Sequence, residues 1–199
     1  MHDWVSGLAR LHGALSLCAG TLVIAGFIPY ILAILRRATE PAKASWVIWA
    51  TLDWITFAGM VAKGTVNGQM IGAVIGVSIT VVLVLKLGKP GWTLLDKTCL
   101  GGAVLGVALW AITANPVMGI ATSCIVILLG SIPTFVSTWE DPSHENGLAW
   151  TLYWFSCLFT IAAIPSWTPA ATLQPITITV VESIKIVLPF VRPRQRAHA

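Results

Sequence analysis

Charge is what this sequence has least of. Only 10% of its 199 residues are Asp, Glu, Lys or Arg, while 56% are hydrophobic. A soluble domain carries roughly 25% charged residues, so this chain could not cover a surface that faces water. Composition therefore excludes a soluble globular domain and favours an integral membrane protein. The charges are also clustered, which leaves four long uncharged stretches at 11–35, 64–85, 98–139 and 146–181.

The sequence also lacks the motifs of catalysis and of nucleotide-driven transport. It contains no His-Glu-x-x-His, no Gly-x-Ser-x-Gly and no phosphate-binding glycine-rich loop. Its four cysteines have no metal-ligand spacing. We therefore expect a protein that is not an enzyme, with no catalytic residues, no metal and no cofactor. The excess of 12 basic over 8 acidic residues falls at predicted helix ends, which indicates membrane topology and argues against nucleic acid as a partner.

What the sequence does have is a series of apolar runs. A helix needs about 20 apolar residues to cross the hydrocarbon core of a bilayer. The runs are continuous and do not alternate with period two, which favours helices over the strands of a barrel. Gly, Pro and Asn-rich segments separate them. The sequence thus predicts an all-α polytopic membrane protein with seven transmembrane helices near 11–36, 45–63, 69–87, 96–113, 116–138, 147–164 and 170–191.

The basic residues also predict an orientation. Cytoplasmic loops of membrane proteins carry an excess of Lys and Arg. With the N-terminus outside and the C-terminus in the cytoplasm, Arg10 and Lys63 fall outside, and Lys185 lies within the last span. The other nine basic residues then fall on the cytoplasmic side, and they are Arg36, Arg37, Lys43, Lys86, Lys89, Lys97, Arg192, Arg194 and Arg196.

An internal repeat is suggested by shifting the chain by 104 residues. Both halves then show a mid-span proline, a polar loop with a second proline, and an aromatic pair that opens the next helix. Three helices reverse direction, so a single linking helix would make the two units parallel. We predict a 3+1+3 parallel repeat with a first unit at 1–95, a linker helix at 96–114 and a second unit at 115–199. The aligned pairs include Gly26 with Gly130, Pro29 with Pro133, and Trp46 with Trp150.

This arrangement resembles the PQ-loop superfamily, which includes the SWEET sugar transporters and, more distantly, the nicotinamide riboside transporters. In that superfamily a Pro-Gln pair lies toward the end of the first helix of each unit. Here the matching positions are Pro29-Tyr30 and Pro133-Thr134, so both prolines are present and both glutamines are replaced. The stretch 27–49 looks like that of bacterial PQ-loop-like membrane proteins without an assigned substrate. The resemblance implies the fold and a bacterial inner-membrane location, but no sugar or amino-acid substrate is carried over.

Three ionisable residues lie inside predicted spans. Asp53 is near the middle of the second span, and Glu182 and Lys185 are three residues apart in the seventh, so they share one helix face. A charge inside a membrane is costly, by about 2.5–3.5 kcal/mol on insertion scales, and often marks a site. These residues are therefore predicted to bind a substrate. The alternative is structural: Glu182 and Lys185 neutralise each other, and Asp53 bonds a neighbouring helix.

Further candidates lie at a similar depth. Trp49 shares a stripe of the second helix with Asp53, and an acid beside indole rings suits a cationic or aromatic ligand. Ser78 and Ser183 correspond at a shift of 105 residues and are predicted to be polar contacts of the substrate. For the serines, the alternative is a hydrogen bond to a carbonyl oxygen one turn back in their own helix. For the tryptophan, it is packing between helices or against lipid.

The candidates favour a membrane transporter or facilitator of a small polar or aromatic solute that works by alternating access. Pro29 and Pro133 each remove a helix hydrogen bond, and we predict them as hinges; static kinks are the alternative. A non-transporting receptor-like or assembly-partner protein on the same fold remains the second hypothesis. The predicted partners are the small-molecule solute and the lipid bilayer. A homo-oligomer stays open because two Gly-x-x-x-Gly patterns, Gly72 with Gly76 and Gly102 with Gly106, suit helix contacts between or within protomers.

Overall fold

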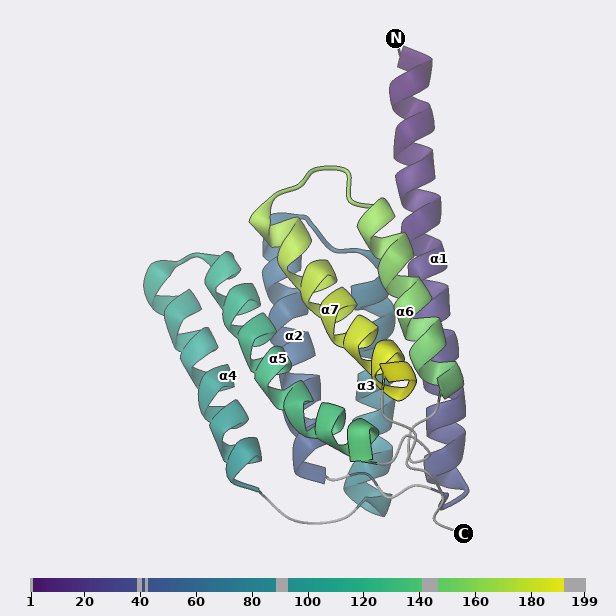
Figure 1. Ribbon diagram of the computed structural model, residues 1–199. Helices are drawn as coiled ribbons and strands as arrows, with labels where there is room; N and C mark the ends of the chain where they lie inside the picture. The colour runs from purple at the N-terminus through teal and green to yellow at the C-terminus, as the bar shows by residue number, and fades with distance from the viewer. Residues whose placement is uncertain (1, 39–40, 42, 89–92, 141–146, 192–199) are drawn as a thin grey trace.

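The computed structural model describes residues 2–38, 41, 43–88, 93–140 and 147–191, and every regular element in these ranges is a helix (Figure 1). The seven helices predicted from the sequence are present, which confirms the all-α fold. Their ends agree closely with prediction except for the first helix, which begins at His2 and not near residue 11. The helices are α1 (His2–Leu35), α2 (Lys43–Lys63), α3 (Gly68–Leu87), α4 (Leu94–Thr113), α5 (Pro116–Glu140), α6 (Gly147–Ala162) and α7 (Pro169–Val191).

The helices end at residues that favour an end. Asn67 caps α3, because its side-chain oxygen accepts a hydrogen bond of 2.8 Å from the backbone N–H of Met70. Pro116 opens α5, at a position where a helix needs no N–H donor, and Asn115 caps the same helix. Gly64 follows α2 with φ of 64°, a left-handed conformation that glycine adopts without strain. These residues explain why the long apolar sequence divides where it does.

Consecutive helices run in opposite directions, and α1 extends beyond the others at its N-terminal end (Figure 1). We refer to α1, α2 and α3 as the first triplet and to α5, α6 and α7 as the second triplet. In the first triplet α3 packs on both α1 and α2, and in the second triplet α7 packs on both α5 and α6. Between the triplets, α1 packs on α6 and α2 packs on α5. Helix α4 stands at the edge and packs on α5 and α2.

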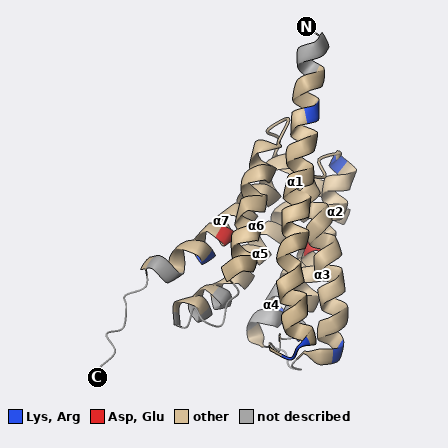
Figure 2. Cartoon of the chain, turned by 90° about the vertical axis from the view of Figure 1, so that its right-hand side faces the viewer, with Lys and Arg blue, Asp and Glu red and all other residues tan. Residues whose placement is uncertain are grey.

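Basic residues lie mainly at the ends of the helices, whereas the acidic residues drawn in red lie part-way along them (Figure 2). The end at which α1 begins and α2 finishes carries Arg10 and Lys63. Lys185 is the exception, because it lies inside α7 near Glu182. The opposite end carries most of the basic residues in the described ranges, and they are Arg36, Arg37, Lys43, Lys86 and Lys97.

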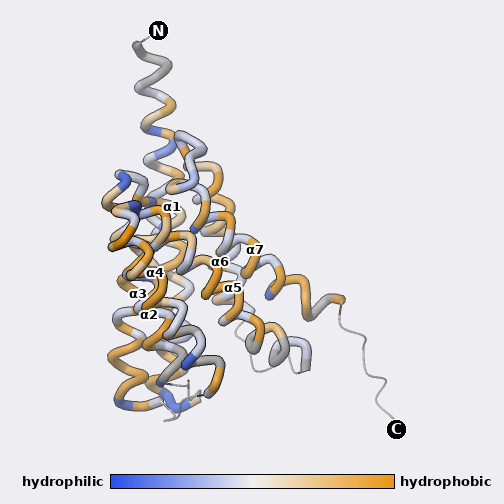
Figure 3. Tube along the Cα trace, turned by 90° about the vertical axis from the view of Figure 1, so that its left-hand side faces the viewer, coloured by the Kyte–Doolittle hydropathy of each residue, from blue (hydrophilic) through white to orange (hydrophobic). Residues whose placement is uncertain are grey.

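Hydrophobic residues recur along the helices (Figure 3), and many of them are exposed on the outside of the bundle. Leu17 is 72% exposed and Ile112 is 81% exposed, and many other Leu, Ile and Val side chains are also exposed. Apolar surface of this extent is typical of a face that meets lipid or another protein. Three helical stretches in the described chain are long and apolar enough to span a membrane: Ser6–Leu35, Gly68–Leu87 and Pro169–Leu188. The fold is therefore that of a helical membrane protein.

Glycines allow α1 and α3 to approach closely. A Cβ at Gly72 would overlap the side chain of Val23 and would lie 2.8 Å from the carbonyl oxygen of Gly20, and a Cβ at Gly76 would overlap the ring of Phe27. In the second predicted pair, Gly102 faces Val126 and Gly106 faces Thr122, both on α5. Both Gly-x-x-x-Gly patterns therefore serve contacts within one protomer.

The α1–α3 contact gives a first prediction. Gly72→Leu should destabilise the protein by about 1–3 kcal/mol, because the new side chain meets the backbone of α1 and that backbone cannot move aside. Gly101→Leu on α4 is the matched control, since nothing lies within 4 Å of a Cβ built there. Melting of the purified protein in detergent would measure both. Equal melting temperatures for the two variants would contradict the described packing of α1 on α3.

Candidate functional site

A buried lysine lies between two tryptophans from different triplets. The Nζ atom of Lys185 on α7 lies 3.4 Å from the ring centroid of Trp150 on α6 and 5.6 Å from that of Trp49 on α2. Lys185 is only 3% exposed. A cation over an indole face is attracted by the negative face of the ring, more strongly where water is excluded. Lys185, Glu182, Trp49 and Trp150 are called the Lys185 cluster below.

Glu182 supplies the negative charge of this cluster. Its Oε1 lies 3.8 Å from Nζ of Lys185, and the two residues share one face of α7, as their three-residue spacing predicts. At that distance the two side chains form an ion pair, but the separation is longer than the length of a charge-assisted hydrogen bond, which is about 2.8 Å. The ammonium therefore lies nearer to the ring centroid of Trp150 than to the carboxylate. Glu182 is 6% exposed, so the pair is packed inside the bundle.

Aromatic side chains extend from the cluster on both sides. Trp49 lies 6.4 Å from Trp46, whose ring lies 5.1 Å from that of Tyr30 on α1. On the second triplet, Trp150 lies 5.5 Å from Tyr153. The ring of Tyr153 meets Phe27 of α1 edge-on at 5.4 Å, which is a favourable aromatic geometry. The cluster is thus the centre of an aromatic region formed by helices of both triplets. In the sequence, Trp46 and Trp150 stand out only as an aligned pair of the predicted repeat.

Asp53 lies on α2 four residues from Trp49 and therefore about one turn away. The residue as a whole is half-buried. It lies near Cys124 of α5, which in turn lies near Thr177 of α7. Among the residues that the structure describes, no hydrogen bond or ion pair reaches its carboxylate. The structural alternative of a bond to a neighbouring helix is therefore not what this conformation contains.

The two predicted serines do not meet Asp53 or the Lys185 cluster through hydrogen bonds. Ser78 on α3 accepts a hydrogen bond of 3.2 Å from the indole N–H of Trp54 on α2. Ser183 on α7 accepts one of 3.0 Å from the indole N–H of Trp154 on α6. The same kind of bond thus links the second and third helices of each triplet. Both serines act as acceptors for tryptophan.

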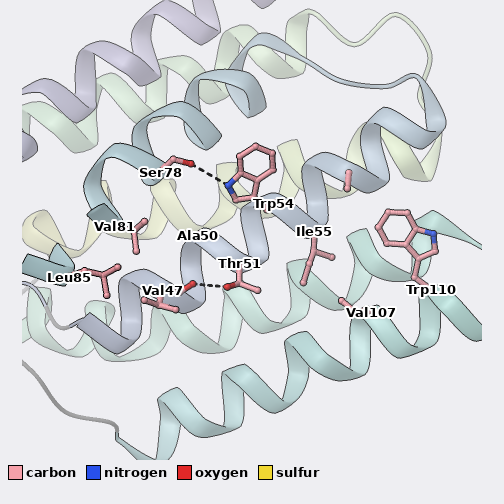
Figure 4. A pocket seen from close by; sticks show the side chains of 11 residues that line it. Val47, Ala50, Thr51, Trp54, Ile55, Ser78, Val81, Leu85, Val107 and Trp110 are labelled. Carbon is pink, nitrogen blue, oxygen red and sulfur yellow. Dashed lines mark hydrogen bonds between the residues drawn. The ribbon is translucent and has the colours of Figure 1, made fainter. Parts of the chain in front are cut away.

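A groove of about 620 Å³ lies beside Ser78, on a surface formed by α2, α3 and α4 (Figure 4). Its lining is almost entirely apolar, and the indole of Trp54 forms one wall. Asp53, Glu182 and Lys185 do not line it. In this conformation the groove and the Lys185 cluster are therefore separate features. The lining residues are Val47, Ala50, Thr51, Trp54, Ile55, Ala58, Ser78, Val81, Leu85, Val107 and Trp110.

A chain of side-chain amides joins the triplets at the end where α3 and α7 begin. Asn67 Nδ2 donates to Gln174 Oε1 at 3.3 Å, and Gln174 Nε2 donates to Gln69 Oε1 at 3.3 Å. Gln69 Nε2 then donates to Cys157 Sγ at 3.2 Å. Gln69 and Gln174 are 2% and 4% exposed, so these bonds satisfy amides that water does not reach. This chain of four residues is called the amide seam below.

Sequence reasoning missed the amide seam, although a signal was present. The shift of 105 residues that aligns Ser78 with Ser183 also aligns Gln69 with Gln174. Three further contacts join the triplets: Thr65 Oγ1 donates to the carbonyl oxygen of Ala170 at 3.2 Å, and Ser156 Oγ donates to that of Ala19 at 2.8 Å. His12 Nδ1 lies 3.0 Å from the carbonyl oxygen of Ala163.

The predicted hinge residues lie within continuous helices. α1 runs from His2 to Leu35 with Pro29 inside it. Pro133 belongs to the helical backbone of α5, and its side chain is outside the described residues. Neither proline ends its helix, so each removes one backbone hydrogen bond from a helix that continues past it.

The described ranges contain no group of three His, Cys, Asp or Glu side chains arranged to hold a metal ion. What the Lys185 cluster offers is a buried carboxylate and two indole faces, which can hold a positive charge. Comparisons of the chain with protein-family models, with curated proteins and with solved structures found no match.

Proposed function

We propose that the chain is a seven-span membrane protein built as a 3+1+3 parallel repeat. The helix packing supports this, because it is unchanged when α1 is exchanged with α5, α2 with α6 and α3 with α7. The packing of α1 on α6, for instance, corresponds to that of α5 on α2, and α4 falls outside the exchange. Gln69 and Gln174, which correspond at the shift of 105 residues, bond each other directly. The resemblance to the PQ-loop superfamily belongs to the same proposal.

The proposed orientation places the N-terminus outside and the C-terminus in the cytoplasm. Five of the described basic residues lie at the end proposed to be cytoplasmic, against Arg10 and Lys63 at the other, which is the asymmetry expected of an inner membrane protein. The amide seam then lies toward the outside. The Lys185 cluster lies deeper, because Lys185 is eleven residues further along α7 than Gln174, or about 16 Å at 1.5 Å per residue.

We further propose that the protein moves a small polar or aromatic solute by alternating access, with the Lys185 cluster and Asp53 as its binding region. The observation that carries this is the buried ion pair enclosed by tryptophans of both triplets. An ionisable pair inside a membrane bundle is costly and marks a functional site by default. A site between two related halves is accessible from alternate sides when the halves rock. Pro29 and Pro133 are proposed as the bends that accompany this motion.

One observation favours the second candidate, a non-transporting receptor-like or assembly-partner protein. Glu182 and Lys185 are packed inside the bundle, and the groove between α2, α3 and α4 opens elsewhere. For a transporter this packing corresponds to a closed state. For a non-transporting protein it would be permanent. The two candidates therefore differ in whether any solute crosses.

Uptake by the reconstituted protein tests the proposal. Proteoliposomes are loaded in turn with sugars, amino acids, nucleosides, vitamins or organic cations, and exchange of labelled external solute is followed. We expect one class to exchange and Asp53→Asn to reduce its rate by about tenfold or more, because Asp53 supplies the one carboxylate of α2, one turn from Trp49. Normal exchange in Asp53→Asn would exclude Asp53 from the site. No exchange of any class by folded protein would favour the non-transporting candidate.

A further inference from the structure

The Lys185 cluster has the chemistry of a cation-binding site that is already filled. Recognition of ammonium ligands uses aromatic faces around the charge, with a carboxylate nearby. Here the faces belong to Trp150 and Trp49, the carboxylate belongs to Glu182, and the ammonium belongs to the protein itself. The indoles come from α6 and α2, so both triplets contribute to holding one charge.

We propose that the solute is an organic cation whose ammonium group takes the place of the Lys185 ammonium between Trp49 and Trp150. This proposal rests on the proposed transport function and names its substrate class. The lysine side chain has four rotatable bonds, so its ammonium can leave the indole faces while α7 stays in place. Glu182 remains as the counter-charge of the incoming cation. Lys185 is thus an internal competitor that keeps the site occupied when the solute is absent.

The opposite assignment makes Lys185 a ligand for an anionic solute. The position of the ammonium argues against it, because Nζ faces an indole ring at 3.4 Å and a carboxylate at 3.8 Å. An anion bound to Lys185 would meet the negative face of Trp150 and the charge of Glu182. Both would repel it. The neighbouring titratable side chains also disfavour an anion, because none of them adds a positive charge. They are Tyr153 and Cys157 of α6, which lie near Glu182, together with Tyr30 of α1 and Asp53 of α2.

The two assignments predict opposite effects of one substitution. Lys185→Met keeps the length and apolar stem of the side chain and removes its charge. If Lys185 is a competitor, this variant should bind choline about tenfold more tightly than the parental protein, because the indole faces are vacated and Glu182 is retained. If Lys185 is the ligand of an anion, the same variant should lose benzoate binding. Lys185→Arg is the matched control, since it retains a cation and should keep choline binding weak.

The probes are choline, its uncharged isostere 3,3-dimethyl-1-butanol, and benzoate. Binding to purified protein is measured by calorimetry, and exchange of labelled choline is measured in proteoliposomes. We expect choline to bind and exchange, the isostere to bind at least about tenfold more weakly, and Trp150→Leu to lose choline binding. Trp54→Leu, on the groove, serves as the aromatic control and should leave choline binding unchanged. Should Lys185→Met be unfolded, Trp150→Leu and the isostere carry the test on their own.

Equal binding of choline and its isostere would overturn cation recognition. Loss of benzoate binding in Lys185→Met would replace the proposal with an anionic substrate. Exchange of a neutral solute class without choline exchange would also overturn the substrate class, while leaving the transport function intact. Absence of exchange for every class tested would remove the transport function and this inference with it.

Discussion

Glu182→Leu is expected to destabilise the protein by about 3–5 kcal/mol, because it removes the carboxylate that forms an ion pair with the buried ammonium of Lys185. For a chain of this length, that corresponds to a fall in melting temperature of roughly 10 °C. Thermal unfolding in detergent, followed by monodispersity on a sizing column, measures the effect.

The double variant Glu182→Leu with Lys185→Met provides the control. It removes both charges and fills the same volume, and replacing a buried ion pair in this way is often neutral for stability. The methionine sulfur can also contact the ring of Trp150. We expect the double variant to melt within a few degrees of the parental protein and yet to exchange no solute. Normal exchange by this folded variant would reduce the ion pair to a structural role.

Locking the amide seam is expected to abolish solute exchange. Gln69→Cys with Gln174→Cys, joined by a short bifunctional thiol reagent, would fix α3 to α7 at the end proposed to face outside. Alternating access requires the two triplets to separate there when the site opens outward. Because Gln69 also contacts Cys157, the experiment needs a background in which Cys18, Cys99, Cys124 and Cys157 are replaced.

Cleavage of the reagent by a reductant should restore exchange, and each single cysteine variant treated with the same reagent should retain it. Complete exchange by the cross-linked protein would show that the triplets need not separate at the amide seam. The amide seam would then be a static contact, and the proposed motion would have to be placed elsewhere.

The elements of the fold could be predicted because each follows from local sequence. Uncharged runs, Asn67, Pro116 and Gly64 set the helix ends, and the structure has all seven helices. The first predicted span begins near residue 11, where the uncharged run begins, whereas helix α1 already starts at His2. A helix can continue through a charged residue, and α1 runs without a break through Ser6, Gly7 and Arg10 from its start at His2.

The site could be predicted only within single helices. The three-residue spacing of Glu182 and Lys185 predicted their contact because both residues lie on α7. The approach of Trp150 to Lys185 depends on how α6 packs against α7, which no local pattern contains. Ser78 and Ser183 were predicted to contact a substrate, but each accepts a hydrogen bond from a tryptophan on a neighbouring helix. Which helices are neighbours could not be known from the sequence. Gln69 and Gln174 were overlooked because each alone is an ordinary polar residue near a helix start.

Labelling of position 53 from both sides of the membrane distinguishes a transporter from a non-transporting protein. Asp53→Cys, in the cysteine-free background, is exposed in oriented vesicles to a membrane-impermeant thiol reagent from the outside and, separately, from the inside. The proposed alternating access predicts labelling from both sides, with each rate changed by a transported solute. Labelling from one side only, or from neither, in a folded protein would contradict it.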